Sequence, residues 1–334
     1  MFKYIVKRLL ISVLILFGVS LILYILVRLM PMDYIDIKFA SQLNQGTITL
    51  EDIQRYKDLY GIGDNSFKGI VGGYFKWLGK LCIGDLGYSF QYEKEVSTVI
   101  VENMWISFGI AFVATILQFI IAIPLGITSA THQYSVRDYT VTVLTMLGIS
   151  LPTYFFGAIV IKLFAVDLGW FPVSGLLSSG ASYPETFGGQ LLRFGDIIHH
   201  LILPIFVSVL LSIGGLMRYT RTNTLEVLTA DYIRTARAKG LSEKTVVYKH
   251  AFRNTLVPLV TMFAGILPGL FGGMLITEQV FGIDGIGNLA YKALRNGDIP
   301  FVMGYNMFLA ILSVIGTLLS DIMYSVVDPR VKLK

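Results

Sequence analysis

The sequence predicts an all-α membrane protein with six transmembrane helices, both termini in the cytoplasm and a long extracytoplasmic loop after the first helix. The composition, six long apolar stretches and the placement of basic residues lead to this prediction. Of the 334 residues, 54% are hydrophobic and 15% are charged, whereas an ordinary soluble domain has about 45–50% and about 25%. Too few charged side chains remain to cover the surface of a soluble protein of this size. The composition therefore excludes a cytosolic enzyme, a disordered chain and a nucleic-acid-binding protein.

Six stretches are long and apolar enough to cross a bilayer as helices. A hydrocarbon core of about 30 Å needs roughly 20 mostly apolar residues. The alternation over short segments that marks a membrane β-barrel is absent, so helices are the expected spanning structure. The expected spans are residues 9–30, 106–129, 139–166, 201–217, 256–276 and 303–326.

The first stretch begins as a signal peptide would, with Lys3, Lys7 and Arg8 ahead of the apolar run. However, the run is long enough to span a bilayer and no small-x-small cleavage pattern follows it. We therefore expect an uncleaved first helix whose N-terminus lies in the cytoplasm.

The placement of lysine and arginine orients the six spans. The segments expected inside hold 15 of these residues, and the longer outer segments hold 10. The outer segment 30–102 exceeds the roughly 60-residue limit within which the positive-inside rule is reliable. The deciding contrast is segment 218–253, between the fourth and fifth spans, which holds eight basic and three acidic residues. We therefore expect this segment and both termini in the cytoplasm.

The long outer loop carries many aromatic residues, among them Tyr74, Phe75 and Trp77, and too many for a disordered linker. We expect it to form short helices at the outer surface, with aromatic side chains at headgroup level. The second outer loop, residues 167–200, is rich in Gly and Ser and begins with Trp170 and Phe171.

The basic cytoplasmic segment reads as a helix, a glycine break and a second helix. Residues 224–239 are good helix formers, and Gly240 stands where a C-terminal glycine ends a helix. Ser242, followed by Glu243, is a typical start of a new short helix that runs to about Phe252. A short helix held on a tight turn is suited to take force from a soluble partner. The alternative is an ordinary positive loop that contacts only lipid headgroups, and charge alone leaves both open.

The same segment resembles the EAA loop of ABC importer permeases. Thr235-Ala236 and Gly240 stand in place of the Glu-Ala-Ala-x-x-x-Gly core, and the glutamate of that core is absent. The dipeptide/oligopeptide/nickel branch is most similar, because its loop reads much like residues 234–242 and continues as His250-Ala-x-Arg-Asn254. The resemblance extends over essentially the whole chain. Further similar stretches are Trp77-Leu78, Gly84-Asp-Leu-Gly-x-Ser89, Leu168-Gly-Trp-Phe-Pro-Val-Ser-Gly175, Glu278-x-Val-Phe281, Gly285-Ile-Gly287 and Asp328-Pro-Arg330.

This resemblance implies the permease subunit of a type I ABC importer in a bacterial or archaeal cell membrane. It implies a homologous second permease, two ABC ATPases, an extracellular solute-binding (lipo)protein and surrounding lipid, and no nucleic acid. The implied organisation is a first helix at 1–30, an extracytoplasmic region with short helices at 31–102, and a permease core at 103–334 with an EAA-like coupling loop at about 218–254. The residues expected to couple to an ATPase are Thr235, Ala236, Ala238, Lys239, Gly240, Leu241, Ser242, Glu243, His250, Arg253 and Asn254.

The chain itself is expected to be non-catalytic and to hold no cofactor. No Gly-x-x-x-x-Gly-Lys-Ser/Thr run for binding phosphates occurs in it, so ATP and Mg²⁺ would bind the partner ATPases. Peptides are the first expectation for the substrate, with nickel or another small solute as the alternative. An ion-coupled secondary carrier is a further alternative, although its mechanism usually needs buried carboxylates that the spans largely lack. A membrane-embedded enzyme is disfavoured because no catalytic pattern lies at bilayer depth.

The fifth expected span carries Gly265, Gly269 and Gly273 at four-residue spacing, with Pro268 among them. Such a stripe permits close helix packing or provides a smooth wall for a translocation path, and the proline favours a kink. Both interpretations stay open. The residues expected to contact the binding protein are Trp77, Asp85, Trp170 and Pro172.

Three ionisable residues, Lys162, Glu278 and Asp321, lie in or beside the spans. Each is near a predicted helix end, where a charged head can reach the interface at little cost. Gly285-Ile-Gly-Asn-Leu-Ala290 has the spacing of a dinucleotide fingerprint without its βαβ context, so a tight outer turn is expected instead. No metal site is expected, because His199-His200 lack a third ligand nearby in the sequence and Cys82 is the only cysteine.

Overall fold

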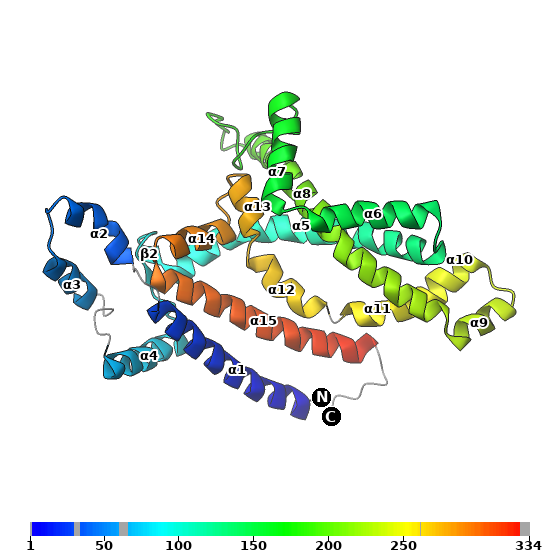
Figure 1. The fold of residues 1–334 in the computed structure, drawn as a ribbon, viewed down its shortest axis with the longest axis horizontal. Helices are drawn as coiled ribbons and strands as arrows, with labels where there is room; N and C mark the ends of the chain where they lie inside the picture. The colour runs from blue at the N-terminus through cyan, green and yellow to red at the C-terminus, as the bar shows by residue number, and fades with distance from the viewer. Residues whose placement is uncertain (1, 30–33, 60–65, 261, 328–334) are drawn as a thin grey trace.

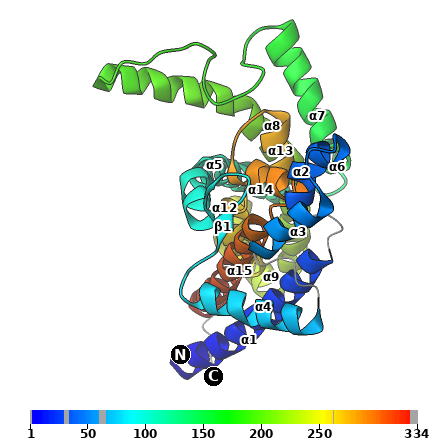
Figure 2. The same cartoon turned by 90° about the vertical axis from the view of Figure 1, so that its left-hand side faces the viewer.

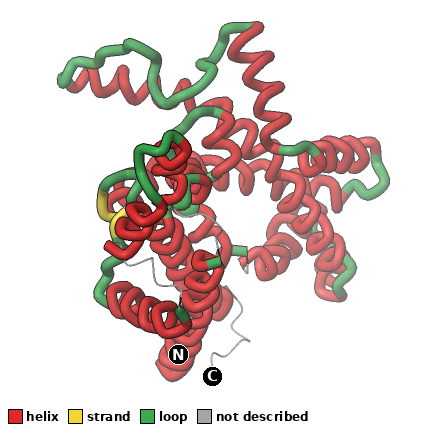
Figure 3. Tube along the Cα trace, turned by 60° about the vertical axis from the view of Figure 1, so that its left-hand side comes forward, coloured by secondary structure: helices red, strands yellow, loops and turns green. Residues whose placement is uncertain are grey.

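The computed structural model describes residues 2–29, 34–59, 66–260 and 262–327, and this part of the chain is mostly helical (Figure 3). Within it, four helices are long and apolar enough to cross a membrane. They are α1 (Phe2–Arg28), α5 (Val96–Thr131), α8 (Phe187–Leu228) and α15 (Ile299–Val327). They correspond to four of the six expected spans.

The expected span 139–166 is not one straight helix. It consists of α6 (Val136–Ser150) and a second segment, α7 (Thr153–Val160) with the π-helical η1 (Ile161–Asp167), bent by 104° from α6. The break falls at Leu151-Pro152. Proline has no N–H to donate into a helix and forces the preceding residue toward extended geometry, and Leu151 has φ −84° and ψ 129°.

The expected span 256–276 is likewise divided within the described residues. It is formed by α11 (Phe252–Val260) and α12 (Phe263–Phe271), followed by the short α13 (Leu275–Val280). Gly273 adopts φ +75° between α12 and α13, in a left-handed conformation that ends a helix. The prediction of six continuous helices is therefore not met at these two places, and the number of membrane crossings stays a prediction.

The region after α1 folds as the short helices that its aromatic content predicts. These are α2 (Tyr34–Asn44), α3 (Leu50–Leu59) and α4 (Phe67–Cys82), followed by a small antiparallel pair that was not expected, β1 (Tyr88–Ser89) and β2 (Lys94–Glu95). Buried Asp298 holds this pair, because its Oδ2 accepts the Ser89 hydroxyl and the Gln91 N–H.

The molecule is elongated, with α2 and α3 at one end and α9 (Asp231–Ala238) and α10 (Glu243–Thr245) of the basic loop at the other, whereas α7 stands across the long axis (Figure 1). Helix α1 runs antiparallel beside α15, as Figures 1 and 2 both show, and Arg8 Nε lies 2.9 Å from Asp321 Oδ2. The start of α1 and the end of α15 consequently point toward the end that carries the basic loop. This is the arrangement that the expected topology requires.

Candidate functional site

The basic loop between α8 and α11 forms a compact helical hairpin. Helix α9 (Asp231–Ala238) ends at Lys239 and Gly240, and α10 (Glu243–Thr245) continues through η2 (Val246–Ala251) into α11. Gly240 has φ +76°, and its N–H donates to the carbonyl of Arg237 at 2.9 Å. The helix–glycine–helix prediction is therefore confirmed.

Two details of that prediction are wrong. The expected helix 224–239 is two helices, because α8 ends at Leu228 and α9 begins at Asp231. The second helix does not stop near Phe252, because η2 continues directly into α11. The Ser242 cap is present, since its Oγ accepts the N–H of Thr245 at 3.4 Å.

The hairpin has a small apolar core and an ion pair across its turn. Ile233 and Ala236 of α9 pack against Val246 and Ala251, which follow the turn. Arg237 Nη2 lies 2.6 Å from Glu243 Oε1. The hydrogen bonds from this guanidinium hold the pKa of Glu243 below its ordinary value and raise the pKa of Arg237. The hairpin is therefore preformed, with its own core.

Most of the residues predicted for coupling lie on the outer surface of the hairpin. Those exposed on the hairpin are Thr235, Ala238, Lys239, Gly240, Leu241, Ser242 and Glu243, whereas His250 is half-buried. Arg253 and Asn254 are also exposed, at the start of α11. Ala236 is buried and belongs to the hairpin core instead. Tyr232 and Tyr248 are also exposed, at 46% and 51%, and were missed. Ile233 and Ala236 recur at the spacing of a buried helix face, and this pattern leaves Tyr232 on the outer side of α9.

The three glycines of the expected stripe, Gly265, Gly269 and Gly273, lie in two different environments. Gly265 and Gly269 line a cavity of about 260 Å³ between α5, α8 and α12. A Cβ at either glycine would meet nothing within 4 Å, so neither is closely packed within this chain. The described residues that line the cavity are uncharged, and the polar ones are Thr115, Gln118, Ser208 and Ser212.

Gly273 instead packs against the backbone of Gly287, where there is no room for a Cβ. Both glycines surround Glu278, which is fully buried. Its Oε1 accepts the Ser107 hydroxyl at 2.7 Å and the Met274 N–H at 2.9 Å. Its Oε2 accepts the N–H of Asn288 at 2.8 Å. The carboxylate thus joins α13, the start of α14 (Ile286–Arg295) and α5.

The expectation that Glu278 reaches the interface from a helix end is therefore wrong. Three hydrogen-bond donors offset the free-energy cost of removing its carboxylate from water. Buried polar groups in proteins are usually hydrogen-bonded in this way. Gly285 completes the enclosure, because a Cβ there would lie 2.5 Å from Glu278 Cδ. The two stretches Glu278-x-Val-Phe281 and Gly285-Ile-Gly287 are thus parts of one structure.

The other ionisable residues singled out form ion pairs. Lys162 Nζ lies 2.8 Å from Asp167 Oδ2 in an exposed position, and Asp321 pairs with Arg8. His199 contacts the carbonyl of Trp170, and His200 contacts the carbonyl of Asp196. Within the described ranges, no group of three or more His, Cys, Asp or Glu side chains is arranged to hold a metal ion.

The residues predicted to contact a binding protein lie in different surroundings. Trp77 is partly buried against Tyr24 of α1, with ring centroids 6.1 Å apart, and its expected position at headgroup level stays a prediction. Asp85 is exposed and accepts the N–H of Gly87 at 2.8 Å. Trp170 is 60% exposed, and Pro172 is half-buried. The role of all four in contacting a partner stays a prediction.

Comparison with known proteins gives consistent matches over most of the chain. The family model "Binding-protein-dependent transport system inner membrane component" matches residues 122–333. The oligopeptide transport system permease protein AppB of Bacillus subtilis is 37% identical over 333 residues, which is 99% of this chain and all of that protein. The di/tripeptide transport system permease protein DppB of Pseudomonas aeruginosa is 32% identical, with 99% of each chain covered.

A solved structure supports the fold. An inward-facing structure of the MetNI methionine ABC transporter matches with a TM-score of 0.52 and 19% identity. The match covers 70% of this chain and 97% of that one. At this identity the likeness concerns the fold alone.

Proposed function

The chain belongs to the family of binding-protein-dependent transport system inner membrane components, and on that premise we propose that it is the permease subunit of an ATP-driven importer of peptides. Full-length similarity to oligopeptide and di/tripeptide permeases supports peptides as the substrate. Nickel or another small solute carried by the same machinery is the alternative.

The observation that carries this proposal is the preformed hairpin of α9 and α10. It lies at the end of the molecule toward which both the start of α1 and the end of α15 point (Figure 1). Exposed Tyr232, Leu241 and Tyr248 provide apolar contact area on an otherwise basic element. Aromatic side chains of this kind typically anchor protein interfaces. We propose that this surface binds an ATPase subunit.

The chemistry of the cycle resides on partner subunits. The sequence contains no phosphate-binding Gly-x-x-x-x-Gly-Lys-Ser/Thr run, and the family consists of inner-membrane transport components. ATP and Mg²⁺ would bind two separate ATPases, whose closure moves the hairpin of this chain and that of a second, homologous permease. An extracellular solute-binding (lipo)protein would deliver the peptide to the outer end.

The cavity lined by Gly265 and Gly269 is our candidate for part of the translocation path. Its walls combine small residues with uncharged polar groups such as Thr115 and Gln118. Such walls offer hydrogen bonds to peptide groups without selecting the charge of a side chain. The path would be completed by the second permease as the pair alternates between outward-open and inward-open states.

The proposed topology has six crossings with both termini in the cytoplasm of a bacterial or archaeal cell. The broken segments α6–α7 and α11–α12 would supply the two crossings that are not single long helices. Residues 1–30, 31–102 and 103–334 would be the first helix, the extracytoplasmic region and the permease core. The chain would hold no cofactor of its own.

Uptake by the reconstituted complex tests the function. Liposomes containing this chain, its partner permease and both ATPases should accumulate a labelled tripeptide only when ATP and the binding protein are both present. Accumulation of Ni²⁺ but not peptide would support the alternative substrate. Uptake by this chain alone, or uptake that collapses with the proton gradient at constant ATP, would indicate an ion-coupled carrier and refute the proposal.

A crosslink tests the docking surface. A Ser242→Cys variant, in a Cys82→Ser background, should crosslink to the ATPase. Labelling of that cysteine from outside intact cells would contradict the topology.

A further inference from the structure

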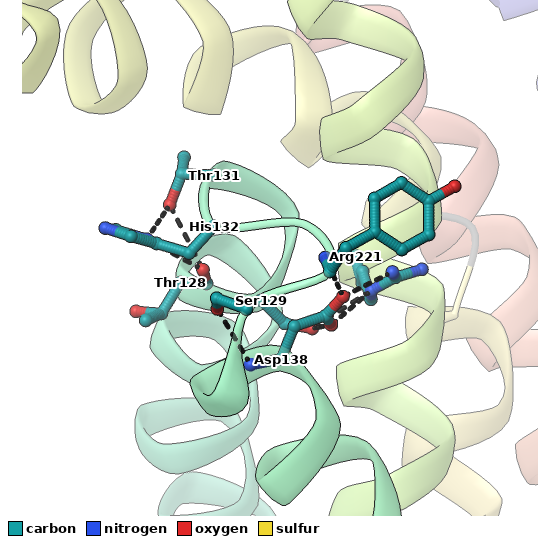
Figure 4. Close-up of polar contacts among 8 residues, drawn as sticks. Thr128, Ser129, Thr131, His132, Asp138 and Arg221 are labelled. Carbon is teal, nitrogen blue, oxygen red and sulfur yellow. Dashed lines mark hydrogen bonds and ion pairs between the residues drawn. The ribbon is translucent and has the colours of Figure 1, made fainter.

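A buried polar cluster connects three helices near the hairpin of α9 and α10 (Figure 4). It consists of Ser129 at the end of α5, Asp138 in the first turn of α6 and Arg221 in the last turns of α8. Ser129 and Asp138 are buried, at 0% and 4% exposure. Figure 4 shows the three side chains converging on one point between the helices.

Both oxygens of the Asp138 carboxylate accept hydrogen bonds in this cluster. Arg221 binds both oxygens, with Nη2 2.9 Å from Oδ2 and Nε 3.0 Å from Oδ1. The Ser129 hydroxyl donates to Oδ1 and its oxygen accepts from Arg221 Nε at 3.0 Å. The backbone N–H of Tyr134, in the turn between α5 and α6, donates to Oδ2 at 3.0 Å.

Close backbone contacts join the same three helices. A Cβ on Gly126 of α5 would lie 2.7 Å from the Met217 carbonyl oxygen of α8. A Cβ on Gly148 of α6 would lie 2.8 Å from the Leu210 carbonyl oxygen of α8. A Cβ on Gly214 of α8 would lie 2.5 Å from the Thr145 carbonyl oxygen of α6. Glycine thus allows α5 and α6 to approach the backbone of α8 closely.

The hairpin is attached directly to this unit. Only Thr229 and Ala230 separate α8 from α9, and their N–H groups donate to the last turn of α8. Val227 and Leu228 of α8 pack on the apolar core of the hairpin. A displacement of the hairpin is therefore transmitted to the end of α8 through packed side chains and hydrogen bonds.

The Asp138 side chain is 5% exposed and the Arg221 side chain 26%, and an ion pair so far removed from water is a weak source of stability, because desolvation offsets much of the attraction between the charges. Its clearer effect is geometric. A bidentate contact between a guanidinium and a carboxylate fixes both the distance and the orientation of the two groups. The cluster therefore holds the α5–α6 turn in one position relative to α8.

We propose that the cluster of Ser129, Asp138 and Arg221 makes α5, α6 and the end of α8 a single lever that the hairpin moves. Asp138 and Arg221 are then positioning residues for energy coupling. Their contact makes α5 and α6 move together with α8. This inference rests on the proposed function, since it requires an ATPase that moves the hairpin.

The first test measures peptide transported per ATP hydrolysed in the reconstituted complex. Asp138→Asn and Arg221→Lys should each lower this ratio about tenfold, within the usual range of coupling free energies, while ATP hydrolysis continues. Lys162→Gln is the matched control, because Lys162 Nζ forms an ion pair of similar length, 2.8 Å from Asp167, in an exposed position. Wild-type ratios in both cluster variants, or an equal loss in the control, would overturn the proposal.

A second test replaces the polar cluster with a covalent link. In a Cys82→Ser background, the Ser129→Cys/Arg221→Cys variant should couple poorly until a short bifunctional thiol reagent joins the two positions, and then regain transport per ATP. Crosslinking that leaves coupling low would show that α5 and α8 must move relative to one another, against the proposal. If the wild-type complex hydrolyses ATP without any uptake, the proposed function itself fails and the lever fails with it.

Discussion

Gly240 allows a test in which backbone conformation is separated from steric contact. Its φ of +76° lies in the left-handed region, and a Cβ placed on it would meet nothing within 4 Å. Substitution therefore strains the turn between α9 and α10 without creating a clash. A left-handed conformation costs an L-residue roughly 1–2 kcal/mol relative to glycine. That energy changes the ratio of two conformations by about 5- to 30-fold.

Substitutions of Gly240 should therefore impair coupling to different degrees, according to how readily each residue adopts a left-handed conformation. Gly240→Asn should have the smallest effect, because asparagine adopts left-handed conformations more readily than other residues with a Cβ. Gly240→Ala should be intermediate, and Gly240→Val should be most affected because β-branching adds restriction. In the reconstituted complex we expect peptide transported per ATP hydrolysed to fall in that order, with the chain still inserted.

Gly46, in the turn between α2 and α3, is a matched control. It has φ +72° and also meets nothing within 4 Å. Gly46→Val should introduce similar strain at the opposite end of the molecule and leave coupling unchanged. Wild-type coupling in Gly240→Val, or an equal loss in Gly46→Val, would refute the assignment of the hairpin as the element that transmits force.

Three further predictions concern the other sites. Gly285→Ala should lower the thermal stability of the detergent-solubilised chain by about 1–3 kcal/mol, because its Cβ would lie 2.5 Å from Glu278 Cδ; an unchanged Tm would contradict this packing. Gly269→Phe should fill part of the 260 Å³ cavity and reduce peptide uptake without changing Tm, and full uptake would exclude the cavity from the path. The hydrogen bonds from Arg237 hold the pKa of Glu243 below its ordinary value, so the ion pair should stabilise the hairpin fully above that ordinary pKa and weaken as pH falls through the lowered pKa. Both side chains are partly exposed, so the effect should be below about 1 kcal/mol. Hydrogen exchange of hairpin amides, corrected for the intrinsic rate, should show this pH dependence, and Glu243→Gln should abolish it.

Local features of the sequence are sufficient to predict the hairpin of α9 and α10. Gly240 ends α9 and Ser242 caps the next helix through contacts within a few residues, so the residue types themselves specify the turn. The break at Leu151-Pro152 was equally local, yet the continuous hydrophobicity of residues 139–166 outweighed the proline in the sequence prediction. Length and apolar character therefore located the long apolar segments but not their bends.

The composition alone determined that this is a membrane protein, because 54% hydrophobic residues with 15% charge cannot form a soluble surface. Tertiary structure alone decided which polar residues lie in the interior. Ser107 and Glu278 are 171 positions apart, and Asp138 and Arg221 are 83 apart. No local periodicity encodes such pairs, because the free energy of a buried charge depends on the donors that distant helices bring to it. The sequence therefore predicts an interfacial Glu278, whereas the fold buries this residue fully.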